Sequence, residues 1–154
     1  MPSDASIADM RISIKSAVLI AAQLACIAYL LVSDPWRAHL HWAWLEAVGL
    51  CLGAWAVFTI KLQNVRIAPE VGRGGRLVTH GPYRFIRHPM YAAVLLVTLA
   101  WLLDRFTGAR LVAWLVLAGD LLIKLEYEEQ LLGKRFSEYP AYRARTNRLV
   151  PFVY

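Results

Sequence analysis

The amino-acid sequence predicts an all-α integral membrane protein with about four transmembrane helices arranged in two hairpins. Of its 154 residues, 58% are hydrophobic and 18% are charged, and the mean hydropathy is +0.44. Soluble domains average roughly 45–50% apolar and about 25% charged residues. The length allows one domain, residues 1–154, whose core is too small to bury this apolar excess. Cys26 and Cys51 both lie in apolar stretches, which does not indicate a disulfide framework.

Two stretches with almost no charge predict the first two helices. Residues 16–32 carry no charged side chain, and residues 40–60 carry only Glu46. Each reaches the length of about 17–25 residues that a membrane-spanning helix needs. Asp34 and Pro35 between them favour a turn, so we expect residues 1–62 to form a tight N-terminal transmembrane hairpin.

Two shorter apolar stretches predict the second hairpin. Residues 89–103 are uncharged, residues 111–123 contain only Asp120, and a polar turn with Gly108 separates them. Pro89 suits the first turn of a helix, where its missing N–H costs nothing. We expect these helices to continue into polar segments, and residues 63–154 to combine a cofactor-binding loop, the second hairpin and a C-terminal helix.

The distribution of basic residues predicts the orientation. Residues 61–88 hold six of the 17 Lys and Arg residues against one acidic residue, and six more lie from Lys124 onward. An even number of spans places both segments on one side, which the positive-inside rule assigns to the cytoplasm. In a chain this apolar, the net charge of +6 indicates membrane orientation and not nucleic-acid binding.

The two basic segments also contain residues that suit a binding site. Asp120, Lys124 and Glu128 recur every four residues, so they share one face of a helix. Ionisable groups near membrane depth are costly and face a cavity or a partner when they occur. The chain contains no dinucleotide-binding glycine pattern after a strand, no P-loop and no serine-nucleophile motif, and its histidines and cysteines lack the spacing of metal ligands.

One pair of motifs carries a family resemblance. Arg87-His-Pro-Met-Tyr91 precedes a short apolar helix, and Glu128-Glu129 follows it, ahead of a Tyr-rich basic stretch that closes at Pro151. In this order and spacing, roughly residues 75–151 resemble the integral-membrane isoprenylcysteine carboxyl methyltransferase and phospholipid methyltransferase group. The resemblance implies methyl transfer from S-adenosyl-L-methionine to a lipophilic or lipid-anchored acceptor, most similar to isoprenylcysteine carboxyl O-methylation.

The resemblance also implies which residues form the site, in a cytoplasm-facing pocket between the loop and the last long helix. Lys124 falls where prenylcysteine enzymes have an arginine near the substrate, and with Arg87 it is an expected catalytic residue. The residues that match cofactor-contacting positions of the family are Gly75, Arg76, Leu77, Val78, Tyr83, His88, Pro89, Met90, Tyr91, Glu128 and Glu129.

Several alternatives remain open at this stage. Lysine in place of arginine at position 124 loses bidentate carboxylate recognition, so a phospholipid or other small-amine N-methyltransferase is the alternative within the methyltransferase hypothesis. A membrane reductase of the sterol-reductase type has a related tail but more spans. A non-enzymatic scaffold whose basic loop binds anionic headgroups is the third hypothesis. The sequence leaves open the acceptor, the choice among O-, N- and S-methylation, and the oligomeric state.

Overall fold

The computed structural model describes residues 14–33, 41–61 and 77–151, and this part of the chain contains helices and no strand. Four long helices agree with the four apolar stretches of the sequence. The elements are α2 (Ile14–Val32), α3 (Ala43–Lys61), the 3₁₀ helix η1 (Gly81–Arg84), α4 (Pro89–Asp104), α5 (Gly108–Arg135) and α6 (Tyr139–Arg143). The prediction of an all-helical fold is confirmed for these residues.

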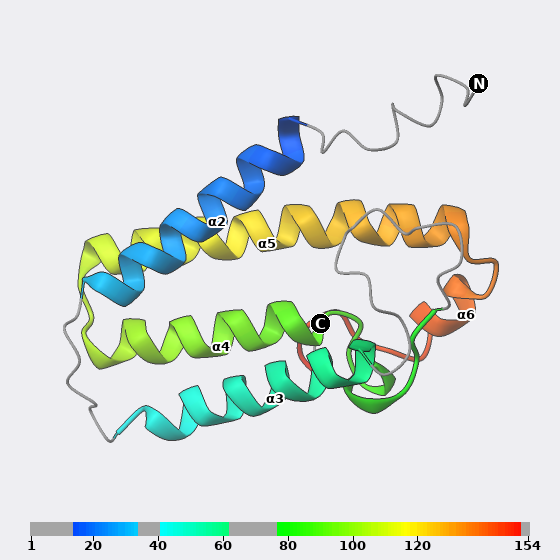
Figure 1. Ribbon diagram of the computed structural model, residues 1–154, viewed down its shortest axis with the longest axis horizontal. Coiled ribbons are helices and arrows are strands. Elements are labelled where there is room, and N and C mark those ends of the chain that lie inside the picture. The colour runs from blue at the N-terminus through cyan, green and yellow to red at the C-terminus, as the bar shows by residue number, and fades with distance from the viewer. Residues whose placement is uncertain (1–13, 34–40, 62–76, 152–154) are drawn as a thin grey trace.

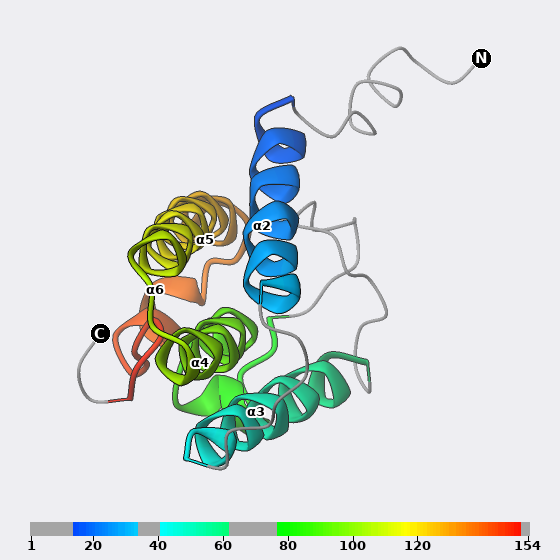
Figure 2. The same ribbon diagram turned by 90° about the vertical axis from the view of Figure 1, so that its left-hand side faces the viewer.

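The pairing of the helices differs from the expected N-terminal hairpin. α4 lies between α3 and α5, and α2 packs mainly against α5 (Figure 2). The tight hairpin expected for residues 1–62 is therefore wrong, because α2 and α3 each pack chiefly against a helix of the C-terminal half. On the α2–α5 side, Leu30 joins Leu117 and Leu121 in one buried cluster.

Small residues explain why α3 packs against α4. Gly49 and Gly53 are four residues apart and face α4, where an added Cβ at Gly49 would lie 2.8 Å from Val97 Cγ2 and 3.1 Å from the Ala93 carbonyl oxygen. An added Cβ at Gly53 would lie 3.3 Å from Ala93 Cβ. Pairs of small residues with this spacing let two helix backbones approach closely in membranes.

The lengths of the helices only partly support four membrane spans. Residues 43–60 of α3 are long and apolar enough to cross a bilayer, whereas the apolar helices Ala17–Val32 and Pro89–Asp104 are shorter. Four spans are therefore not confirmed. Large apolar side chains on the outer faces, such as Val18, Trp44, Phe58 and Val112, are more than half exposed. Such surfaces are typical of contact with lipid and not with water.

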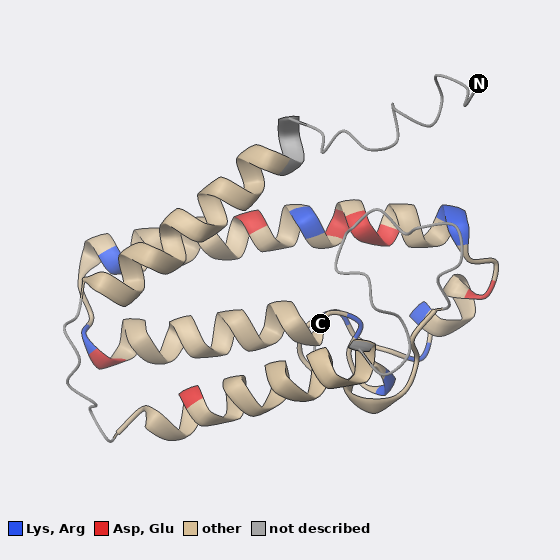
Figure 3. Cartoon of the chain, in the orientation of Figure 1, with Lys and Arg blue, Asp and Glu red and all other residues tan. Residues whose placement is uncertain are grey.

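The two ends of the bundle differ in their charges. η1 and α6 lie together at one end, and the α4–α5 turn lies at the other (Figure 1). Charged residues gather on the second half of α5 and around α6 and η1, while α3 and α4 show very few (Figure 3). At the opposite end the buried Arg110 donates to Ser33 Oγ and to the Trp101 carbonyl oxygen, each at 2.6 Å. These bonds hold the ends of α2, α4 and α5 together.

Candidate functional site: the junction of the two motifs

The first motif is held in place by the C-terminal segment. Ile86 and Asn147 form a parallel bridge, in which the Arg87 N–H donates to the Asn147 carbonyl at 2.8 Å. The His88 N–H donates to the Arg148 carbonyl at 3.1 Å, and α4 begins at the next residue, Pro89, as predicted. These backbone hydrogen bonds fix the position of the motif, from which its side chains extend into the site.

Two further contacts fix the turn that precedes this motif. Tyr142 of α6 donates its hydroxyl to the Tyr83 carbonyl oxygen at 2.7 Å, and burial raises the pKa of both tyrosines. Gly81 has a φ of 60° and approaches α3 so closely that an added Cβ would lie 2.7 Å from Thr59 Oγ1. Glycine at this position meets both the left-handed backbone and the close approach.

The second motif faces the first across the α4–α5 interface. The Tyr91 hydroxyl donates to Glu128 Oε1, and His88 Nδ1 lies 3.6 Å from Glu128 Oε2. The rings of His88 and Tyr91 stack with centroids 5.6 Å apart and an interplanar angle of 4°. His88, Tyr91 and Glu128, separated by up to 40 positions in the chain, thus form one cluster, which we call the carboxylate–aromatic cluster.

Glu129 has a different environment from its neighbour. Its Oε1 accepts from Arg87 Nε at 2.7 Å, and both side chains are buried. Arg87 also donates to the carbonyl oxygens of Arg143 and Thr146, and Arg148 Nη2 lies 3.3 Å from Glu129 Oε2. Burial opposes ionisation of Glu129, but the nearby His88 imidazole, the hydrogen bond from Arg87 and the positive charges of Arg87 and Arg148 lower its pKa to about 2. Glu129 and Arg87 together attach α5 to the C-terminal segment.

Glu128 has weaker electrostatic partners than Glu129. Among the described residues, no Arg or Lys forms an ion pair with Glu128, whose side chain is 27% exposed. Burial raises its pKa, against the Tyr91 hydrogen bond and the charges of His88 and Lys124. His88 Nε2 is buried and lies 3.6 Å from Glu129 Oε1, just beyond hydrogen-bond distance. This arrangement can stabilise a cation next to two stacked rings.

Comparison with known proteins shows the family of the chain. Residues 40–139 match the family model described as phospholipid methyltransferase. The chain belongs to the phospholipid methyltransferase family. The family resemblance predicted from the two motifs is thus confirmed, and this family consists of membrane-associated methyltransferases.

One curated relative of this family member is the nickel-cobalt-cadmium resistance protein NccN of Alcaligenes xylosoxydans xylosoxydans. The two sequences are 31% identical over 121 residues, which cover 73% of this chain and 55% of the relative. The chain therefore spans about half the length of that protein. No solved structure matches the chain.

Lys124 lies one turn before Glu128, on the side of α5 that faces α2. Its Nζ is 3.3 Å from Asp120 Oδ2 and donates to Gln23 Oε1 of α2. The shared face predicted for Asp120, Lys124 and Glu128 is consistent with these contacts, because Lys124 also acts electrostatically on Glu128. In this member of the phospholipid methyltransferase family, the lysine is engaged by protein groups on two sides.

The remaining predicted residues are placed as follows. Met90 lines an apolar groove of about 320 Å³ between α2, α3 and α4, together with Ile27 and Gly53. Leu77 and Val78 are half-buried at the start of the last described segment, and Gly75 and Arg76 lie outside the described residues.

Sequence reasoning missed the partners of these residues. Gln23 of α2 and Tyr142 of α6 contact site residues more than 50 positions away. A glutamine inside an otherwise apolar helix was the available signal for Gln23, since polar groups in such helices face a partner. Within the described part of the chain, no three His, Cys, Asp or Glu residues are placed to hold a metal ion.

Proposed function

We propose that the chain catalyses methyl transfer from S-adenosylmethionine to a lipophilic or lipid-anchored acceptor. The observation that carries the proposal is the Glu128 carboxyl beside the stacked rings of His88 and Tyr91, with no ion pair to an Arg or Lys of the described residues. Both methyltransferase motifs contribute to this cluster, and the family match supports the reaction class.

The residues of the cluster fit the charge of this cofactor. Glu128 would hold its α-ammonium group, and the aromatic rings would face its sulfonium, since both cations favour carboxylates and π-faces. When bound, S-adenosylmethionine supplies an electrophilic methyl group for in-line displacement by the acceptor. The protein then chiefly aligns the reactants and excludes water. We assign contacts to the rest of the cofactor to the segment of Gly75, Arg76, Leu77 and Val78 on the resemblance alone.

The apolar groove between α2, α3 and α4 suits the hydrophobic part of the acceptor. Met90 lines this groove, and the next residue, Tyr91, donates to Glu128. An apolar chain in the groove would bring its polar end toward the carboxylate–aromatic cluster and the neighbouring Lys124. The acceptor would then enter sideways from the bilayer.

Two acceptor chemistries have support in the site. An isoprenylcysteine-type carboxylate would need Lys124 as its positive partner. A phospholipid amine would be favoured by the Asp120 and Glu128 carboxylates on the same helix face, and by the family description. Lys124→Gln should abolish methylation of a carboxylate acceptor and spare an amine acceptor, as measured by mass spectrometry of products from both acceptor classes.

The cofactor assignment is tested by calorimetric binding of S-adenosylmethionine to the protein in nanodiscs. Glu128→Gln should weaken binding about tenfold or more, because a hydrogen bond to a charged group contributes about 1.5–3 kcal/mol. Glu126→Gln is the matched control, since Glu126 is exposed and pairs with Arg148. Equal affinity of the wild type and a folded Glu128→Gln variant would refute the assignment, and salt-sensitive binding without saturation would favour a scaffold.

A further inference from the structure

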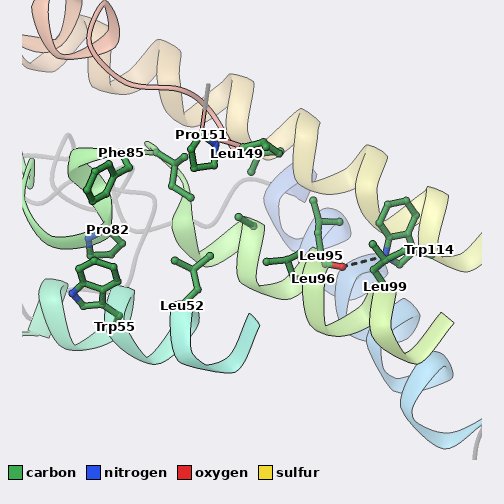
Figure 4. A pocket seen from close by; sticks show the side chains of 13 residues that line it. Leu52, Trp55, Pro82, Phe85, Leu95, Leu96, Leu99, Trp114, Leu149 and Pro151 are labelled. Atoms are coloured by element: carbon green, nitrogen blue, oxygen red, sulfur yellow. Dashed lines mark hydrogen bonds between the residues drawn. The ribbon is translucent and has the colours of Figure 1, made fainter. Parts of the chain in front are cut away.

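A second apolar groove lies on the other side of α4. It has a volume of about 480 Å³ and is bounded by α3, α4, the η1 turn, Trp114 of α5 and the C-terminal residues Leu149 to Pro151. Figure 4 shows Trp55, Pro82 and Phe85 at one end and Trp114 at the other. We call it the C-terminal groove. Its volume lies within the range of about 300–1,000 Å³ that is usual for ligand pockets.

The C-terminal groove is separate from the proposed acceptor groove. Ala92, Leu95 and Leu99 of α4 line the C-terminal groove, whereas Met90 and Val97 line the other. At 3.6 residues per turn, the two sets project from opposite sides of the helix. His88, Tyr91 and Glu128 line neither groove, so a molecule in the C-terminal groove would not displace the carboxylate–aromatic cluster.

A positive charge lies at the mouth of the C-terminal groove. The Arg84 guanidinium carbon is 5.5 Å from the centroid of the Phe85 ring, and Phe85 lines the groove. Arg84 is exposed, and no ion pair engages it within the described residues. Phe85, Trp55 and Val150 are about half exposed, so the groove opens sideways. A ligand with an anionic head and an apolar chain matches this combination.

We propose that the C-terminal groove binds an anionic phospholipid that is not the methyl acceptor. One acyl chain lies along Leu95 and Leu99, and the phosphate lies at Arg84. The lipid thereby covers Leu149 and Val150. These residues directly follow Asn147 and Arg148, whose carbonyl oxygens accept the backbone hydrogen bonds of Arg87 and His88. This site does not depend on the proposed methyl transfer.

The test is native mass spectrometry of delipidated protein titrated with phosphatidylglycerol or phosphatidylcholine. We expect one phosphatidylglycerol to bind about tenfold more tightly than phosphatidylcholine. Arg84→Gln should remove this preference, and Val150→Asp should weaken phosphatidylglycerol binding at the mouth of the groove. Lys134→Gln is the matched control, because it removes an exposed charge of α5 that lines neither groove.

Three results would overturn the proposal. Equal affinity for the two lipids would show that the groove does not recognise charge. An equal loss of preference in Lys134→Gln and Arg84→Gln would show diffuse attraction and no site. Finally, if the bound lipid gained the mass of a methyl group on addition of S-adenosylmethionine, it would be the acceptor and not a separate ligand.

Discussion

At the scale of single residues, two consecutive glutamates have different partners. They differ in direction by about 100° around α5, as adjacent helical residues do. Glu129 therefore faces Arg87 and the C-terminal segment, whereas Glu128 faces Tyr91. The motif identified both as candidate cofactor ligands. The sequence could not separate their environments, because the separation depends on where Arg87 and Arg148 lie in space.

Breaking the buried pair of Arg87 and Glu129 should strongly lower the stability of the protein. Glu129→Gln should lower the free energy of unfolding by about 3–5 kcal/mol, since it leaves the Arg87 charge buried without its partner. Glu126→Gln breaks the exposed contact with Arg148 and should cost about 1 kcal/mol or less. Denaturant unfolding in a mild detergent measures both variants. A loss under 1 kcal/mol for Glu129→Gln would show that the pair does not hold the C-terminal segment.

The ionisation of Glu129 should also make the stability of the fold depend on pH. The pKa of Glu129 is about 2 in the folded protein, below its ordinary value of 4.5. Ionised Glu129 therefore contributes stability that is fully present above pH 4.5 and is lost as the pH falls toward 2. The wild type should lose stability across this window more steeply than Glu129→Gln. Parallel curves of unfolding midpoint against pH would contradict this assignment.

At the scale of the helices, complementary faces determine the pairing and chain order does not. The sequence predicted the four long helices, since each follows an apolar stretch, and Pro89 marked the start of α4. It did not predict that α3 would pack against α4. That contact depends on Gly49 and Gly53 meeting Ala93 across the interface, and one sequence does not show which small residues face each other.

The close α3–α4 contact gives a prediction with an internal control. Gly49→Ala should destabilise the protein by about 1–3 kcal/mol, because the new Cβ would overlap Val97 and the Ala93 carbonyl. Gly119→Ala in α5 meets open space and should be neutral or stabilise by up to about 1 kcal/mol, since alanine favours helices. Thermal unfolding in the same detergent compares them. Equal midpoints for both variants would argue against the close packing of α3 on α4.

At the scale of the whole molecule, the described parts of the two basic segments, residues 77–88 and 124–148, lie toward the same end of the bundle (Figure 1). The cluster joins residues from α4 and α5 with support from the C-terminal segment. A single sequence identifies the two motifs and their order. The short distance between the two motifs in space depends on the course of the chain: α5 extends past its apolar part, and the chain then returns through α6 toward the start of α4.

This arrangement predicts which positions share one side of a membrane. Single-cysteine variants His80→Cys and Glu138→Cys should react with an impermeant maleimide from the same side, and Phe106→Cys from the other. Cys26 and Cys51 are free and would be replaced by alanine in the background. The measurement uses inverted and right-side-out vesicles. Labelling of positions 106 and 138 from one side would contradict the bundle orientation.

In the proposed function, α5 would also set the depth at which methyl transfer occurs. The 18 helical steps from Arg110 to Glu128 correspond to about 27 Å of helix, against a hydrocarbon thickness of about 30 Å. A membrane orientation with Arg110 at one interface would place the Glu128 carboxyl near the opposite edge of the apolar layer. Candidate acceptors can therefore be ranked by the distance between their nucleophilic atom and their apolar chain, independently of any contact with the protein. Molecules whose nucleophile lies deep among the chains, or far out in water, would miss this level.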